Sequence, residues 1–217
     1  MASREPSRVR ESRGAAIRQA KSNTEAGMSQ AQIATTRAWE ESQRNARTEN
    51  LAVIGEDGTL NPLGNPVVSR GKTSVRSNPA RIPQNAIVTH NHPWDERTDG
   101  TGLGSKVGAS FSDADIANAI TLNNKEKRAV TKNYIYSIKR PAGGWNANPL
   151  DVKRDWDKVY KKESKIFKEL NAKRRSGELT YEEYNVRWGR ANAVVSHRAT
   201  RYVAQKYGFV YTRRKRA

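Results

Sequence analysis

The middle of the chain constrains the fold most, because it alternates between strand-like and helix-like patterns. Ala-Ile-Val-Thr-His (Ala86–His90) places three apolar residues in a row, as a buried strand does. After a polar, Gly-rich stretch, Ser-Phe-Ser-Asp-Ala-Asp begins a helix with Ile116 and Ile120 on one face. Asn133–Pro141 then alternates as a strand with both faces partly covered. Strand, helix and strand in this order predict an α/β fold.

Further short strands are expected upstream. Leu51–Ile54 is β-prone, and the Gly-Glu-Asp-Gly-Thr-Leu that follows contains Asp-Gly, a strong signal for a hairpin turn. One more short strand is predicted at Val67–Ser69, between loops rich in Pro, Gly and Asn. Residues 1–48 are polar and compatible with helix, with Trp39 as their only aromatic residue. They predict a solvent-exposed helical arm, or one that becomes ordered only against a partner.

The last third of the sequence is helical and basic. Its pattern predicts two antiparallel helices joined at Ser176–Gly177, with a capping box from Thr180 to Glu183 opening the second. The final Tyr-Thr-Arg-Arg-Lys-Arg-Ala predicts an unstructured cationic tail. We therefore expect three parts: a polar helical arm at 1–48, an α/β domain at 49–150 and a basic helical extension at 151–217.

Two absences limit both the kinds of site that the chain can form and its location. The chain has no cysteine, which excludes disulfides, thiolate metal sites and a Cys nucleophile, so any metal must be held by His and carboxylate. No apolar run approaches the roughly 18 residues of a membrane span, and the first residues lack the apolar core of a secretory signal. We expect a protein that is not secreted and stays in the compartment where it is made or in a particle assembled there.

Charge is distributed unevenly along the chain. The net charge is +18, of which residues 151–217 contribute +11 from 19 basic and 8 acidic groups. Such a segment indicates a nucleic-acid or other polyanionic partner, and a solvated helical face is the simpler alternative.

One group of residues has the side chains and spacing of a metal site. His90 and His92 are two residues apart at a strand end, so both side chains project to the same face and suit one metal ion. Asp115 lies in the first turn of the following helix and could face the strand end. Two His and one Asp leave a coordination position open for water, as in catalytic zinc sites. Glu49 could serve as the base, and the hydroxyl of Ser112 could stabilise an oxyanion.

The pattern Glu … His-x-His-Pro … Ser-x-x-Asp resembles the JAMM (JAB/MPN) metalloproteases, and Thr-His-Asn-His-Pro is closest to their RadC-like branch. The resemblance implies a mixed β-sheet flanked by helices and zinc-dependent hydrolysis of a peptide or isopeptide bond. It implies His90, His92 and Asp115 as zinc ligands, Glu49 as general base and Ser112 as oxyanion donor.

A narrower resemblance extends from about Glu49 to the end. Segments such as TENLAVIGEDG, YIYSIKRPAGGW and AQKYGFVY are similar to a C-terminal module of phage minor head (head-morphogenesis) proteins. This implies a setting in bacteriophage particle assembly, in the cytoplasm of a prokaryotic host or within a virus particle, with virion or scaffold proteins as substrates. The alternative function is a non-catalytic virion protein that binds DNA or an acidic partner through its basic C-terminal third.

The sequence departs from the family pattern in two places. Nineteen residues, 93–111, separate His92 from Ser112, a longer spacing than is usual, and Phe111 replaces the Pro that precedes the Ser. The extra loop could cover the site. It could also fill the site, and the fold would then be retained without activity. Glu56 is a rival to Glu49 as base. Ser112 and Asp115 also fit an ordinary helix cap, and the two histidines fit a solvated strand end.

Overall fold

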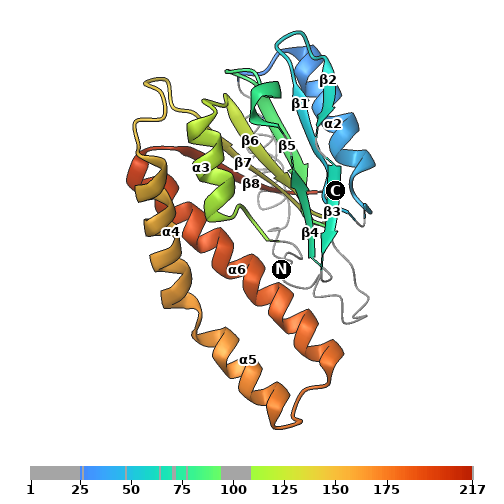
Figure 1. Ribbon diagram of the computed structural model, residues 1–217, viewed down its shortest axis with the longest axis vertical. Coiled ribbons are helices and arrows are strands. Elements are labelled where there is room, and N and C mark those ends of the chain that lie inside the picture. Colours follow the sequence, from blue (N-terminus) through green and yellow to red (C-terminus); the bar gives the residue numbers. More distant parts are fainter. Residues whose placement is uncertain are drawn as a thin grey trace, which may run out of the picture.

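The computed structural model describes residues 25, 27–46, 48–63, 65–69, 72–76, 78–93 and 109–216. At its centre is an open, mixed β-sheet of six strands in the order β2-β1-β5-β6-β7-β8 (Figure 1). These strands are β1 (Leu51–Ile54), β2 (Leu60–Leu63), β5 (Ile87–Asn91), β6 (Glu126–Val130), β7 (Tyr134–Lys139) and β8 (Val210–Lys215). β3 (Asn65–Ser69) and β4 (Lys72–Arg76) form a separate antiparallel pair. The predicted α/β class is confirmed, as is the hairpin of β1 and β2.

A single crossover within the sheet positions the candidate site. β5 and β6 are parallel, whereas the other neighbouring strands of this sheet are antiparallel. A parallel pair cannot be joined by a tight turn, and here the connection includes helix α3 (Asp113–Thr121). The predicted strand at 86–90 and the predicted helix start at Ser112 are both confirmed. The end of β5 and the start of α3 therefore lie at the same end of the strands.

Helices cover both faces of the sheet (Figure 1). On one face, α3, α4 (Pro149–Glu163) and α6 (Tyr181–Tyr207) pack around a large core that includes Phe111, Tyr136 and Trp156. On the other face, Trp39 of α2 (Gln30–Ser42) packs against Ala52, Val130 and Ile135. α5 (Lys165–Arg175) and the first half of α6 extend beyond the sheet as a helical pair. Within the described residues, no helix has the length and apolar character that a membrane span requires.

β6 was not predicted, because three of its five residues, Glu-Lys-Arg-Ala-Val, are charged. All five side chains are nevertheless buried. The guanidinium of Arg128 binds Glu40 of α2 at 2.5 Å and Glu126 at 2.6 Å, and Nζ of Lys139 lies 3.8 Å from Glu126, so two cations balance the two carboxylates. Lys127 points to the opposite face, toward the candidate site, as alternation along a strand requires.

Two expectations about the ends of the chain were wrong. Residues 30–42 are not a solvent-exposed arm, because Trp39 and Glu40 are buried against the sheet; residues 1–24 lie outside the described part. The cationic tail is not unstructured, because β8 pairs with β7 along its whole length and completes the sheet. The predicted hairpin of basic helices is present, although its first arm is divided into α4 and α5 at Ser164. Its second arm opens on the predicted capping box of Thr180 and Glu183.

The core is continuous across the predicted boundary at residue 150. Phe111, Tyr136 and Ile138 from one side of that boundary pack with Trp156 and Val203 from the other. The last third of the chain is therefore part of the α/β body that carries the candidate site.

Candidate metal centre

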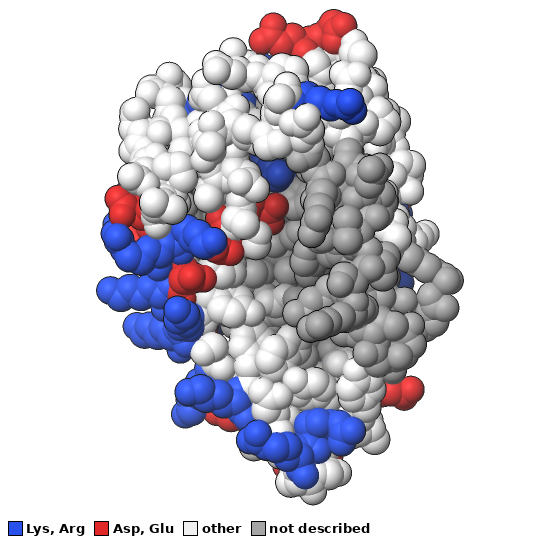
Figure 2. Space-filling view, in the orientation of Figure 1, with Lys and Arg blue, Asp and Glu red and all other residues white. Residues whose placement is uncertain are grey.

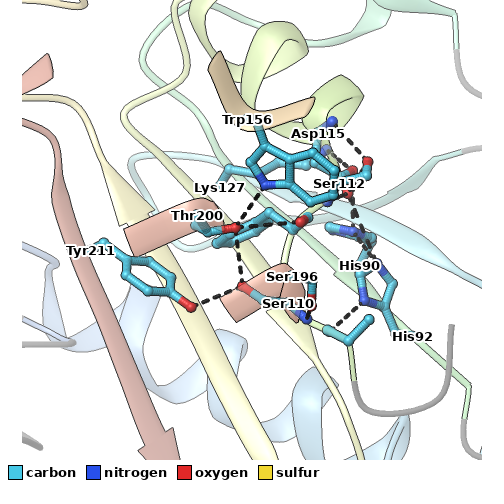
Figure 3. Close-up of polar contacts among 12 residues, drawn as sticks. His90, His92, Ser110, Ser112, Asp115, Lys127, Trp156, Ser196, Thr200 and Tyr211 are labelled. Atoms are coloured by element: carbon cyan, nitrogen blue, oxygen red, sulfur yellow. Dashed lines mark hydrogen bonds and ion pairs between the residues drawn. The ribbon is translucent and has the colours of Figure 1, made fainter. Parts of the chain in front are cut away.

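Two histidines meet at the end of β5. His90 lies in β5, and the backbone N–H of His92 continues the strand ladder by donating to the carbonyl of Val130 at 2.7 Å. Their Nε2 atoms are 3.0 Å apart, and the rings are 1% and 5% exposed (Figure 3). Alternation along the strand sends both rings to the face covered by α3, α4 and α6.

A backbone carbonyl fixes the tautomer of His92. Its Nδ1 lies 2.8 Å from the carbonyl oxygen of Ala109, and a carbonyl oxygen only accepts hydrogen bonds. Nδ1 therefore carries the hydrogen, and Nε2 presents its lone pair toward His90. Burial, followed by the nearby His90, lowers the pKa of His92, so this ring stays neutral to a lower pH than an ordinary histidine does. A neutral imidazole with a directed Nε2 lone pair is the form that binds a metal ion.

Asp115 brings a carboxylate to the two histidines. Its Oδ1 is 3.3 Å from Nε2 of His90, and its Oδ2 is 3.9 Å from Nε2 of His92. Burial by itself raises the pKa of Asp115, but the histidines and Lys127 outweigh burial and hold that pKa well below its ordinary value. The carboxylate is therefore ionised and available as a ligand at neutral pH.

Ser112 is the N-cap of α3. Its backbone N–H and its hydroxyl donate to Oδ2 of Asp115 at 2.9 and 2.8 Å, and its Oγ accepts the N–H of Asp115 at 3.2 Å. The capping box that the sequence indicated as an alternative is thus present. It fixes the Asp115 side chain toward the strand end, and it occupies the single hydroxyl hydrogen of Ser112.

Glu49 joins the histidines from the segment just before the neighbouring strand β1. Leu51 pairs with His90 in the antiparallel β1–β5 ladder, so the residues just before β1 run alongside the residues just after β5. Glu49 is buried, and one carboxylate oxygen together with one ring nitrogen from each histidine lie within 4.8 Å of one another. This group could hold a metal ion. Glu56, the rival candidate, is exposed in the turn at the opposite end of β1.

Asn91, between the two histidines, holds the Glu49 segment in place. Its side-chain oxygen accepts the N–H of Asn50 at 2.6 Å, and its side-chain amide donates to the carbonyl of Thr48 at 2.9 Å. Its backbone N–H also donates to the carbonyl of Asn50 at 3.1 Å. Residues 48 and 50 flank Glu49, so these bonds fix the carboxylate beside the histidines. This role of Asn91 was not predicted from the sequence.

Lys127 was also missed by the sequence analysis. Its Nζ is 4.0 Å from Oδ1 of Asp115, and its side chain is 7% exposed. Burial lowers the pKa of Lys127, while the charges of Asp115 and Glu49 oppose that shift. Nothing in the local sequence Glu-Lys-Arg-Ala-Val signals this position, because the carboxylates that surround the ammonium come from distant parts of the chain.

The site combines two imidazoles and two carboxylates in a buried, cysteine-free environment. The long loop expected between His92 and Ser112 lies almost entirely outside the described residues, which resume at Ala109. Comparison of the chain with protein-family models, with curated proteins and with solved structures gave no match. The geometry of these side chains is therefore the basis for any functional assignment.

Proposed function

We propose that the protein is a zinc-dependent peptide or isopeptide hydrolase of the JAMM type that acts on virion or scaffold proteins during phage assembly. The observation that supports this most is the convergence of Glu49, His90, His92 and Asp115 from three separate segments. Neutral imidazoles and an ionised carboxylate are the donor set that Zn²⁺ prefers where no thiolate is present. The hydrogen bond from Nδ1 of His92 to the carbonyl of Ala109 leaves the Nε2 lone pair of His92 directed toward His90.

In this proposal His90, His92 and Asp115 would hold the zinc, which would supply a Lewis acid for the substrate carbonyl and for water. Glu49 accepts a proton from the attacking water as the water oxygen bonds to the carbonyl carbon. When the C–N bond breaks, Glu49 delivers the proton to the leaving nitrogen. Water is thus divided between an acid and an amine, and no other reactant is required.

Ser112 has two tasks in the proposal, and they occur in sequence. It first holds Asp115 in place through the capping box. To stabilise a developing oxyanion, its hydroxyl must rotate from Asp115 toward the substrate, after which the backbone N–H of Ser112 alone still donates to the carboxylate.

The test measures zinc content and peptide cleavage together. Wild-type protein should bind about one zinc per chain and cleave a virion-derived or generic peptide substrate. His92→Ala should lose the zinc and the activity, whereas Glu49→Gln should keep the zinc and lose the activity. His197→Ala is the matched control, because it removes a histidine from α6 that lies outside the metal group. A wild-type protein that binds no zinc, or a Glu49→Gln variant that retains full activity, contradicts the proposal.

A second candidate function is association with DNA or another polyanion through the basic helices. Four of the six residues that line a shallow groove along α4 are basic: Lys153, Arg154, Lys158 and Lys161. Figure 2 shows Lys and Arg gathered along this side of the molecule and over α5, with fewer acidic groups between them. The groove offers a track of charges that a phosphate backbone could neutralise.

Salt dependence tests this second function. Because α4 also carries core residues, the test replaces surface charges and leaves the segment in place. Changing Lys153, Lys158 and Lys161 to Gln should weaken DNA binding and reduce the slope of log affinity against log salt by about 2 to 3. His90→Ala should leave binding unchanged. Binding that does not respond to salt refutes the idea.

A further inference from the structure

A cavity lies directly beside the metal centre, between it and the C-terminal helices. Its volume is about 240 Å³. The lining residues are His92, Ala109, Ser110, Phe111, Ser112, Asp115, Trp156, Tyr160, Asn192 and Ser196. One wall therefore includes His92, Asp115 and the cap residue Ser112, and the opposite wall consists of residues from α4 and α6. Figure 3 shows Trp156 next to Ser112 and Asp115, with Ser196 near His92.

The wall supplied by α4 is aromatic. The rings of Trp156 and Tyr160 stack with their centroids 4.9 Å apart and an angle of 14° between their planes. The indole N–H of Trp156 donates to the hydroxyl of Thr200 at 3.2 Å, and the hydroxyl of Tyr160 donates to Asn192 at 2.8 Å. Both polar ends are engaged in these bonds. What remains for a ligand is the carbon surface of the two rings.

Three serines of the lining are also engaged within the protein. Ser196 Oγ accepts the N–H of Ser110 at 3.0 Å, and the Ser110 hydroxyl bonds to that of Tyr211 at 2.8 Å. Ser112 binds Asp115. A polar side chain entering the cavity would leave water and find few free partners, which is costly, whereas an apolar side chain gains free energy there.

The same helices fix this wall relative to the metal group. Thr200 of α6 donates to the carbonyl of Phe111 at 3.4 Å, and Ser196 holds Ser110. The carbonyl of Ala109, which sets the tautomer of His92, immediately precedes these two residues. The cavity and the metal group are thus parts of one preorganised arrangement.

We propose that this cavity is a specificity subsite, which receives an apolar side chain of the polypeptide substrate next to the bond that is cleaved. The inference rests on the proposed hydrolase function and identifies its substrate class. An apolar cavity of about 150 Å³ holds one benzene ring, so a cavity of about 240 Å³ has room for a Leu, Met or Phe side chain. Apolar side chains are therefore preferred over charged ones at this position.

The experiment profiles cleavage of a peptide mixture by zinc-loaded protein, read by mass spectrometry. Wild type should cleave where Leu, Met or Phe occupies one position beside the broken bond. Tyr160→Ala enlarges the cavity and should shift the preference toward Trp at that position by tenfold or more. If Tyr160→Ala does not fold, Tyr160→Leu keeps an apolar side chain there and permits the same comparison.

Tyr184→Ala is the matched control. Tyr184 is also a half-buried tyrosine of this helical pair, and its hydroxyl donates to Asn171 at 2.9 Å, as that of Tyr160 does to Asn192. It does not line the cavity, and its variant should keep the wild-type profile. Cleavage that accepts charged residues as readily as apolar ones at every position overturns the subsite, and so does an equal shift in the control. In both cases the hydrolase function itself stands.

If zinc-loaded wild type cleaves no peptide, the hydrolase function fails, and the cavity is tested by binding alone. N-acetyl-phenylalanine methylamide, titrated at millimolar concentration and followed by NMR, should then bind wild type and the Tyr184 variant alike, and bind the Tyr160 variant more weakly. Absence of binding to wild type, or equal binding to all three proteins, overturns the inference.

Discussion

Replacing Lys127 by Met should tighten zinc binding even though it removes a buried, interacting residue of the site. The Nζ of Lys127 is 4.0 Å from Oδ1 of Asp115, a distance at which two unit charges interact by about 4 kcal/mol at an effective dielectric constant of about 20. A divalent cation held by Asp115 is repelled by the same ammonium, and at twice that distance its double charge gives a repulsion of similar size. After screening by water, zinc affinity should rise between about 10- and 1,000-fold.

The metal-free protein should respond in the opposite direction. Without Lys127, Asp115 loses its nearest cationic side chain in a buried place, although it keeps both hydrogen bonds from Ser112. We expect a loss of about 1–3 kcal/mol in the free energy of unfolding, which zinc restores.

The assay is competition with a chromophoric chelator, together with melting curves for the metal-free and zinc-saturated protein. Lys125→Met is the matched control, because it removes the same charge two residues earlier and should leave zinc affinity unchanged. Zinc affinity that is unchanged or lower in Lys127→Met refutes the electrostatic reasoning.

Three other outcomes follow from groups outside the metal centre. Arg128→Met leaves the buried carboxylates of Glu40 and Glu126 without their shared cation, so urea unfolding should show a loss of about 3–5 kcal/mol; a loss under 1 kcal/mol contradicts the α2 docking seen here. Burial, followed by nearby arginines, lowers the pKa of His197 to about 4, so stability should be full above the unfolded value near 6.5 and fall as the pH drops toward 4. In His197→Gln this loss should shrink by about 1–2 kcal/mol, a discounted value because the ring is partly exposed; an unchanged pH profile is the contrary result. Trp156→Ala should lower the free energy of unfolding by about 3–5 kcal/mol, because the indole is buried in the main core. Urea unfolding measures this loss, and a loss near zero would place the ring outside the core.

The parts of the fold and site that could be predicted are those with a local pattern. The strand before His90 has a run of apolar residues, and the capping box of Ser112 and Asp115 marks the start of α3. The buried strand β6 and the role of Lys127 could not be predicted in this way. Their charges are compensated by Glu40 and Asp115, which come from other elements, and such pairing leaves no local signature. The tail was misread for the same reason, since the partner of β8 is β7, about 75 residues earlier.

The last strand of the sheet comes from the end of the chain, so the parts of the candidate site are synthesised in a fixed order. Glu49, the histidines and Asp115 are all synthesised before α6 and β8, which supply the far wall of the cavity and the last strand. About 100 residues separate Asp115 from Arg216, whose guanidinium donates to the backbone carbonyl of Glu40 near the start of the described chain. At about 5–20 residues per second, the metal ligands exist for roughly 5–20 s before the body around them can close. Under the proposed function, the residues that would hold the zinc are thus synthesised well before the helix that completes the cavity, so that the two parts of the site become available at different times.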